Sequence, residues 1–130
     1  MEKAIVEYFL PEKLLENFTI TDIFELGSVS TKKMILEIHL EENNHLPSGY
    51  DPDQYESKGF YPAKTIQDFP VRGKALYLVI KRRRWRHKDR KGEEINNDYS
   101  FIAEGLRITE ELSGFLKGTG RYKGGYDNEY

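Results

Sequence analysis

One short apolar run that passes directly into a basic run limits what this chain can fold into. Residues 75–80 read Ala-Leu-Tyr-Leu-Val-Ile, and residues 81–88 read Lys-Arg-Arg-Arg-Trp-Arg-His-Lys. Side chains of a strand point alternately to two faces, so the apolar residues at even positions share a face with Arg82 and Arg84. Both faces change from apolar to cationic at the same place. We therefore expect a strand over residues 74–86 that begins in a core and then projects from it.

The positive charge of the chain is concentrated around this run. Residues 72–91 hold ten of the twenty Lys and Arg residues and one acid, Asp89, which gives them a net charge of +9. The whole chain carries −2, so the remaining 110 residues carry −11. Such asymmetry predicts a polyanionic partner, and duplex DNA is the first candidate. The residues predicted to contact DNA are Arg72, Lys74, Lys81, Arg82, Arg83, Arg84, Trp85, Arg86, Lys88, Arg90 and Lys91.

A second interpretation of the basic run does not need DNA. The arginines would pair with surplus acids, such as Glu93, Glu94 and Glu104, at the end of a solvated strand. The concentration of cations favours DNA, because like charges that are this close repel one another without a partner. The planar guanidinium group also suits phosphate oxygens and guanine edges. For Trp85, packing under the arginine stems is favoured over stacking on a base. A single-stranded RNA partner would instead stack on Trp85 and Tyr77.

Apolar periodicity predicts short helices at both ends of the chain. A first helix stops before Pro11, and a second opens at Pro11, where the fixed backbone of proline suits a helix start. A last helix is capped by Thr109 and ended by Gly118. The glycine-rich residues 118–130 have no apolar pattern, and we expect them to be a disordered tail. Residues 1–117 would then form one DNA-binding domain.

Two apolar segments near the N-terminus predict the first β-hairpin. Residues 18–26 are rich in β-branched and aromatic side chains, and residues 34–40 alternate between apolar and polar. A turn at residues 27–30 would join them as antiparallel strands. Residues 43–63 hold three prolines and two glycines and have no sustained period, so we interpret them as a long ordered loop.

A second and longer hairpin is expected to carry the basic run. A short strand at residues 65–69 ends at Pro70 and precedes the basic strand. The turn Asp89-Arg90-Lys91-Gly92 would lead to a returning strand in which Tyr99, Phe101 and Ala103 alternate. The predicted fold class is α+β, with about four or five strands in antiparallel β-hairpins and short helices at the N- and C-termini.

Missing residue types exclude several classes of site. The chain has no cysteine, which excludes disulfides, cysteine-ligated zinc and iron–sulfur clusters. The histidines are His39, His45 and His87; we expect His39 and His87 to be exposed, and no metal or cofactor to be bound. There is no glycine-rich phosphate loop, nucleophile elbow or marked pair of acids, so an enzyme is not expected. The many Asp and Glu residues leave a nuclease that uses an acidic pair as the open alternative. With no signal peptide and no apolar run near ~20 residues, a cytoplasmic protein is expected.

The basic strand and the residues before it resemble a known family. The motif Thr65-Ile66-Gln67-Asp68-Phe69-Pro70-Val71-Arg72-Gly73-Lys74-Ala75 runs into Leu76-Tyr77-Leu78 and then Lys81-Arg82-Arg83-Arg84-Trp85. This combination resembles the N-terminal region of bacterial insertion-sequence transposases of the DDE type. The resemblance extends through Ser57-Lys58-Gly59-Phe60 and Phe101-Ile102-Ala103-Glu104-Gly105 to Phe115-Leu116-Lys117. It covers nearly the whole chain up to residue 117.

The resemblance implies a non-catalytic DNA-binding region that recognises the terminal inverted repeats of an insertion sequence during transposition. The catalytic carboxylates would lie in a downstream domain or on a separate chain. In many related transposases this region resembles a zinc ribbon, with cysteine pairs that would fall in residues 43–50 and 87–99. Neither segment contains a cysteine, so the resemblance implies a ribbon-like scaffold without its metal. The alternative is a protein-interaction module that docks on a separate catalytic transposase subunit through the same arginines.

Overall fold

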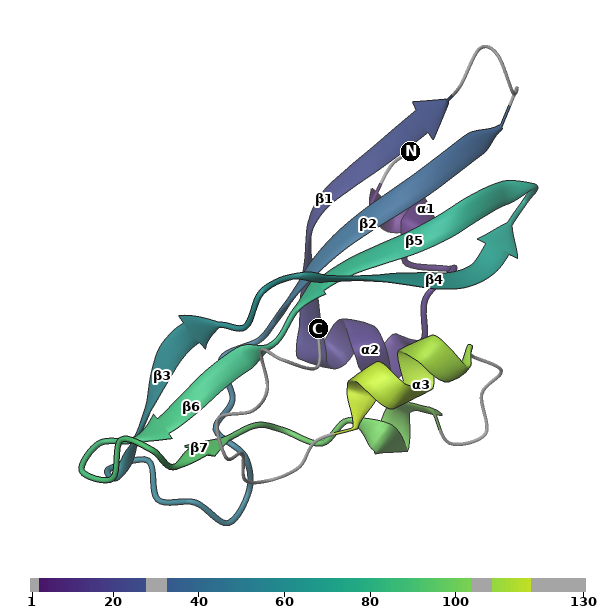
Figure 1. Cartoon of the computed structure of the whole chain (residues 1–130). Coiled ribbons are helices and arrows are strands. Elements are labelled where there is room, and N and C mark those ends of the chain that lie inside the picture. The colour runs from purple at the N-terminus through teal and green to yellow at the C-terminus, as the bar shows by residue number, and fades with distance from the viewer. Residues whose placement is uncertain (1–2, 28–32, 104–108, 118–130) are drawn as a thin grey trace.

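The computed structural model describes residues 3–27, 33–103 and 109–117, and this part of the chain contains short helices and seven strands (Figure 1). The helices are α1 (Lys3–Val6), α2 (Glu12–Asn17), the 3₁₀ helix η1 (Ser100–Ala103) and α3 (Glu110–Leu116). The strands are β1 (Phe18–Gly27), β2 (Met34–Glu42), β3 (Tyr55–Phe60), β4 (Lys64–Val71), β5 (Lys74–Lys81), β6 (Arg83–His87) and β7 (Glu94–Ile95). The expected α+β class, with helices near both termini, is confirmed.

The strands form two sheets. The larger sheet has the order β1-β2-β5-β4, and the smaller sheet has the order β3-β6-β7. Strands β1 and β2 form the expected antiparallel hairpin, with Ile20 opposite Leu40. Strands β2 and β5 are parallel, with Leu36 opposite Leu76, a pairing that the sequence pattern does not predict. In the sequence, β3 and β4 lie between β2 and β5. They run back along the molecule, so β5 can pair with β2 in the same direction.

The basic strand pairs with the strands that precede it, so the expected returning strand at residues 99–103 is wrong. β4 pairs antiparallel with β5, and β3 pairs antiparallel with β6. After β6 the chain returns only through the two residues of β7. Tyr99 instead packs in the main core, with its ring centroid 5.0 Å from that of Phe18 at the start of β1, and Phe101 lies in η1. Tyr99 is buried and Phe101 is exposed, so the alternation of these aromatic residues does not mark a strand.

Part of the segment interpreted as a loop is also a strand. β3 lies within residues 43–63, and its pairing with β6 is irregular between Ser57 and Phe60. Gly59 in this irregular stretch has a φ of 80°. A bulge of this kind interrupts the alternation by which a strand is recognised in a sequence. Because this interruption removes a sustained period, the glycine and proline content of residues 43–63 was interpreted as a loop.

The alternation of buried residues shifts by one position where the chain passes between the sheets. Leu78, Ile80 and Arg82 are buried at even positions, whereas Trp85 and His87 are buried at odd positions. The chain leaves the larger sheet at Lys81 and joins the smaller sheet at Arg83, with Arg82 outside both strands. The basic strand leaves the main core near residue 81, as expected, but it does not project as a free cationic strand. The basic strand enters a second sheet that has an apolar cluster of its own, formed by Tyr55, Trp85 and Ile95.

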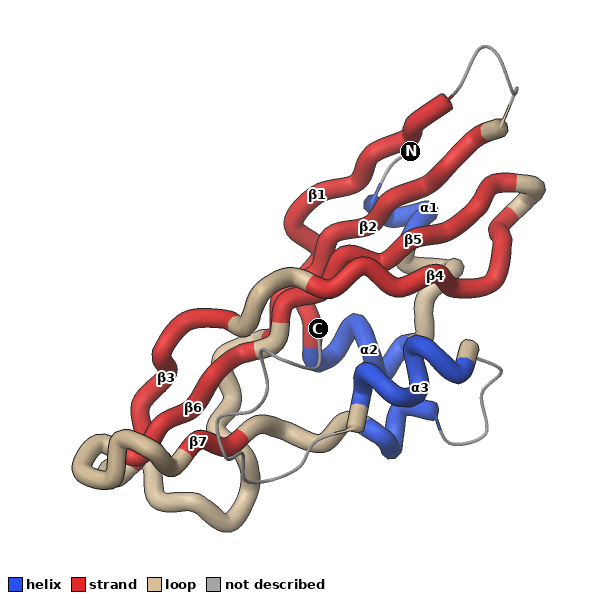
Figure 2. Tube along the Cα trace, in the orientation of Figure 1, coloured by secondary structure: helices blue, strands red, loops and turns tan. Residues whose placement is uncertain are grey.

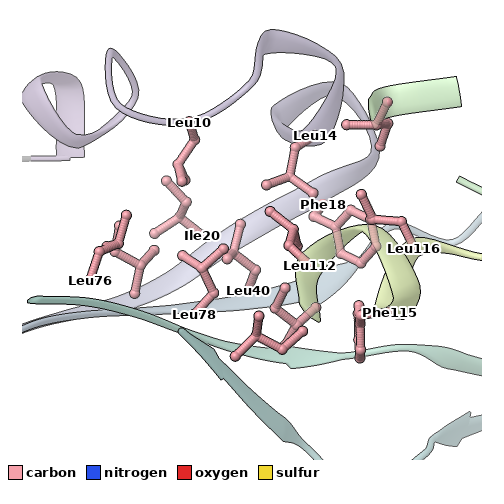
Figure 3. Close-up of a cluster of buried hydrophobic side chains, with 14 of the residues drawn as sticks. Leu10, Leu14, Phe18, Ile20, Leu40, Leu76, Leu78, Leu112, Phe115 and Leu116 are labelled. Carbon is pink, nitrogen blue, oxygen red and sulfur yellow. The ribbon is translucent and has the colours of Figure 1, made fainter. Parts of the chain in front are cut away.

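The main core lies between the larger sheet and the helices. The helices cover one face of this sheet (Figure 2). Leu14 of α2 and Leu112 of α3 point toward sheet residues that include Leu40 and Leu78 (Figure 3). The expected cap is present, since the Thr109 side chain accepts a hydrogen bond from the Leu112 backbone N–H at 3.2 Å. The helices are short, so their stability comes mainly from this packing.

Some expectations fall outside the described residues. These are residues 28–30 of the expected turn at residues 27–30, a partner role for Glu104, the helix end at Gly118, and the tail at residues 118–130. Among the helices of the described chain, none is long and apolar enough to cross a membrane.

Candidate nucleic-acid interface

Most of the expected DNA-contacting cations are paired with acids of this chain. Residues 72–91, here called the basic window, contain ten cations. Among the described residues, six of these cations lie within 4 Å of a carboxylate oxygen: Lys74 with Glu25, Lys81 with Glu41, Arg82 with Glu42, Arg84 with Glu94, Arg86 with Glu56, and Arg90 with Glu93. The interpretation in which arginines pair with surplus acids is therefore correct for Glu93 and Glu94. The charge of the window is partly balanced by acids brought in from other strands.

Arg82 was expected to face DNA, and this expectation is wrong. Its exposed fraction is 4%. One terminal nitrogen donates to the Phe115 and Lys117 carbonyls, at 3.0 and 2.8 Å, and the other donates to the Asn97 carbonyl. These hydrogen bonds hold the end of α3, whose last carbonyls have no partner within the helix. The guanidinium carbon also lies 5.5 Å from the centre of the Tyr99 ring.

Glu42 is the anionic centre of the junction between the two sheets. Its carboxylate accepts hydrogen bonds from the Arg83 backbone N–H at 2.9 Å, from the Asn97 amide at 2.9 Å and from the Tyr99 hydroxyl at 2.6 Å. The Arg82 Nε lies 3.9 Å from the same carboxylate. Burial, together with the Glu42 charge, raises the pKa of Tyr99. The hydroxyl therefore remains a donor to Glu42 throughout the neutral range.

Arg83 is also held within the protein. Its Nε donates to the Glu42 carbonyl at 3.2 Å, and a terminal nitrogen donates to the Ser57 hydroxyl at 3.2 Å. The guanidinium carbon lies 4.7 Å from the centre of the Phe60 ring. Arg83 is thus half-buried and links β6 to β3, which makes it a poor candidate for a DNA contact.

Trp85 and His87 are buried, so neither is available to DNA. Trp85 is 6% exposed and packs with Tyr55 and Ile95, which rules out base stacking and agrees with the favoured packing role. His87 was expected to be exposed but is 4% exposed, with its ring centroid 5.0 Å from that of Tyr55. The shift in alternation after Arg82 places both rings on the inner face of the smaller sheet.

Arg84 and Arg86 lie on the outer face of the smaller sheet. Arg86 is opposite Glu56 on one side and Glu94 on the other. Arg84 lies 3.0 Å from Glu94, and Arg86 lies 3.5 Å from Glu56. The Arg84 side chain is 40% exposed, so its ion pair is accessible to water. Exposed pairs of this kind contribute about 0–1 kcal/mol, and a phosphate can compete for the arginine.

We expect Arg84→Ala to change the free energy of unfolding by less than about 1 kcal/mol, because the lost ion pair is partly hydrated. Urea denaturation followed by circular dichroism measures the change. A loss of several kcal/mol would contradict this, and would mean that the contact of the Arg84 guanidinium carbon with the Tyr61 ring, 5.6 Å from its centre, contributes to the packed core.

The turn between β6 and β7 presents cations to solvent. Lys88, Arg90 and Lys91 are exposed. The His87 Nδ1 accepts hydrogen bonds from the backbone N–H groups of Asp89 at 3.1 Å and Arg90 at 3.0 Å, which closes the turn. Arg90 pairs with Glu93 at 3.1 Å, but its side chain is 64% exposed. The side chains of Lys88 and Lys91 make no hydrogen bond or ion pair with another described residue.

Arg72 occupies the turn at the other end of the basic window. It is exposed, and its side chain has no hydrogen bond or ion pair with the described part of the chain. Lys74 follows the turn and pairs with Glu25 at 3.1 Å. The structure thus divides the predicted contact residues into two solvent-facing turns and a buried or paired centre.

Comparison with known proteins gives no match, either to a protein-family model, to a curated protein or to a solved structure. Within the described residues there is also no group of three or more His, Asp or Glu side chains placed to hold a metal ion. The geometry of the charged groups therefore carries the functional argument.

Proposed function

We propose that the protein is a non-catalytic DNA-binding region of a transposase that recognises the terminal inverted repeats of an insertion sequence. The observation that carries the proposal is the turn between β6 and β7, which extends Lys88, Arg90 and Lys91 into solvent. Its backbone is fixed by two hydrogen bonds to the buried His87. A fixed group of cations suits phosphates, whose contacts supply most of the affinity of many DNA-binding proteins.

The paired arginines on the outer face extend this surface. Arg84 and Arg86 are held by partly exposed ion pairs that cost little to open. On binding, a phosphate would replace Glu94 or Glu56 as the partner of the guanidinium group. The contact set of this proposal is Lys88, Arg90, Lys91, Arg84, Arg86 and Arg72. It leaves out Arg82 and Trp85, which the core encloses.

The transposase assignment draws on the resemblance of residues 65–85 to the N-terminal regions of that family. Within that motif, Arg72-Gly73 makes the turn between β4 and β5, and Trp85 fills the core of the smaller sheet. These motif residues therefore stabilise the fold. The DNA-binding part of the proposal also rests on charge that this packing does not use. The two parts can therefore be tested separately.

The test of DNA binding is a triple variant of the turn. We expect Lys88→Ala/Arg90→Ala/Lys91→Ala to weaken binding to a duplex by about 10–100-fold at about 50 mM salt, because roughly three phosphate contacts are lost. The slope of log affinity against log salt should become less steep by about 3. Fluorescence anisotropy with a labelled duplex measures both quantities.

A charge-matched control is available on the helical side of the molecule. Lys3→Ala/Lys13→Ala/Lys117→Ala removes three exposed cations away from the turn, and it should leave the affinity within about twofold. Equal losses for both triple variants would show a general charge effect and overturn the assignment to the turn. No measurable binding of the unmodified protein to any duplex at low salt would overturn DNA binding itself.

Recognition of transposon ends is tested by a second comparison. A duplex carrying the terminal inverted repeat of the element that encodes the chain should bind more tightly than a scrambled duplex of equal length. A factor of about 10³ is typical of the lower end of specific DNA binding. Equal affinity for the two duplexes would leave DNA binding in place but remove the assignment to transposon ends.

A further inference from the structure

Strands β3 and β4 follow one another along the same outer side of the basic strand. Each is the outermost strand of its sheet, next to β6 and β5 respectively. The ladder continues across the junction: Phe60 is opposite Arg83, the Tyr61 backbone N–H donates to the Arg82 carbonyl at 2.8 Å, and Lys64 is opposite Ile80. The edge therefore leads from the turn at Lys88 to the turn at Arg72 (Figure 1), with irregular pairing between Ser57 and Phe60 and between Asp68 and Val71.

This edge has no acid over most of its length. Residues 57–67 contain Lys58 and Lys64 and no Asp or Glu. The next acid, Asp68, is buried and points to the inner face of the sheet. Glu56 lies before the segment and is already shared by Arg86 and Lys58. In a chain with an overall negative charge, a stretch without Asp or Glu repels a polyanion less than the acidic segments do.

Arg72 stands at the far end of the edge in a strained backbone position. Its φ is 50°, in the left-handed region, where residues other than glycine and asparagine are disfavoured by about 1–2 kcal/mol. Gly73 beside it also has a positive φ, of 78°, as the favoured two-residue hairpin turn requires. Asparagine would suit this turn better than arginine. A strained, exposed arginine without a partner among the described residues points to a functional contact.

From these observations we infer that one DNA duplex lies along the β3–β4 edge and is held at both ends, by Arg72 at one turn and by Lys88 and Lys91 at the other. This inference rests on the DNA binding proposed above. At about 3.3 Å per residue, the sixteen steps from Arg72 to Lys88 span up to ~50 Å. At about 3.4 Å per base pair, that distance corresponds to about 14–15 base pairs. The contact would thus cover more than one turn of the duplex.

The test compares the effect of Arg72→Ala on duplexes of two lengths. A duplex of about 8 base pairs is too short to reach both turns, whereas one of about 20 base pairs spans them. The ratio of unmodified to variant affinity is taken at each length, so the larger number of binding positions on the longer duplex cancels. We expect the ratio to be below about 2 on the short duplex and about 3–10 on the long duplex. Anisotropy at about 50 mM salt measures both.

Two further variants complete the design. Lys88→Ala/Lys91→Ala should weaken both lengths, because the short duplex would bind at the turn that carries more charge. Arg72→Asn is the matched variant for backbone strain, since asparagine accepts the left-handed conformation. It should lose the long-duplex affinity while keeping or raising the thermal stability. A change in stability and affinity together in Arg72→Ala, with normal affinity in Arg72→Asn, would assign Arg72 to the turn alone and overturn the inference.

The remaining outcomes are also decisive. Equal loss on both lengths for Arg72→Ala, or no loss on either, would mean that no single duplex spans the two turns. Binding to the long duplex would then persist, so DNA binding would stand while the path along the β3–β4 edge falls. If the unmodified protein binds neither duplex, DNA binding itself has failed.

Discussion

Replacing Arg82 with alanine is expected to lower the free energy of unfolding by about 3–5 kcal/mol. The side chain is 4% exposed and donates hydrogen bonds to the Phe115, Lys117 and Asn97 carbonyls. Alanine would leave these acceptors without the arginine and would remove the cation nearest the buried Glu42. Natural domains unfold with a free energy of only about 5–15 kcal/mol, so a loss of that magnitude removes a large part of the stability. Urea denaturation measures it.

Two controls separate the position of Arg82 from its charge. Arg82→Lys keeps the charge, but lysine lacks the planar fork that reaches three carbonyls, so it should recover only part of the loss. Arg84→Ala removes the same charge two residues away and should cost less than about 1 kcal/mol. Similar stabilities for Arg82→Ala and Arg84→Ala would contradict a structural role for Arg82 and return it to the set of exposed arginines.

Local pattern predicted the first hairpin and the last helix because each is decided within a short segment. The alternation around Leu36 and Ile38 fits the burial of β2, and Thr109 caps α3. The parallel pairing of β2 with β5 and the position of β3 were missed. Both depend on contacts between segments far apart in the chain, and Gly59 breaks the pattern in β3 at its bulge.

The burial of Arg82 and its pairing with Glu42 were not predicted from the sequence. A run of cations suggests a solvated surface, and strict alternation placed Arg82 and Arg84 on one face. In the structure the two-residue period fails between them, because the chain changes sheets at Arg82. The available signal was Glu41-Glu42 at the end of the first hairpin, two acids just where an apolar strand ends. Such acids could have been matched to the first cations of the basic run, although no local rule gives that pairing.

The junction around Arg82 also bears on the proposed DNA binding. Arg82 and Glu42 lie where the basic strand passes from β5 in the larger sheet to β6 in the smaller one, between the turn at Arg72 and the turn at Lys88. Their contacts fix how the two sheets are placed relative to each other. If the proposed path of the duplex is correct, a substitution at the junction should weaken binding to a long duplex even where the protein stays folded, although it removes no cation of the proposed contact set.

Glu42→Ala is expected to destabilise the protein by about 3–5 kcal/mol, as Arg82→Ala does, because it leaves a buried guanidinium without its nearest anion. It also removes the acceptor of the Arg83 backbone N–H, the Asn97 amide and the Tyr99 hydroxyl. Glu42→Gln retains an acceptor oxygen and should lose less, which separates hydrogen bonding from charge.

The pair itself is tested by the double variant Arg82→Ala/Glu42→Ala. If the two charges stabilise each other, the double variant should cost less than the sum of the single variants by about 1–3 kcal/mol. Strictly additive losses would show that each side chain acts through its own neutral partners: Arg82 through the end of α3, and Glu42 through Asn97 and Tyr99. The 3.9 Å separation of the charged atoms makes this a real alternative. A coupling of the expected size would instead show that the charge pair, together with those hydrogen bonds, joins the two sheets.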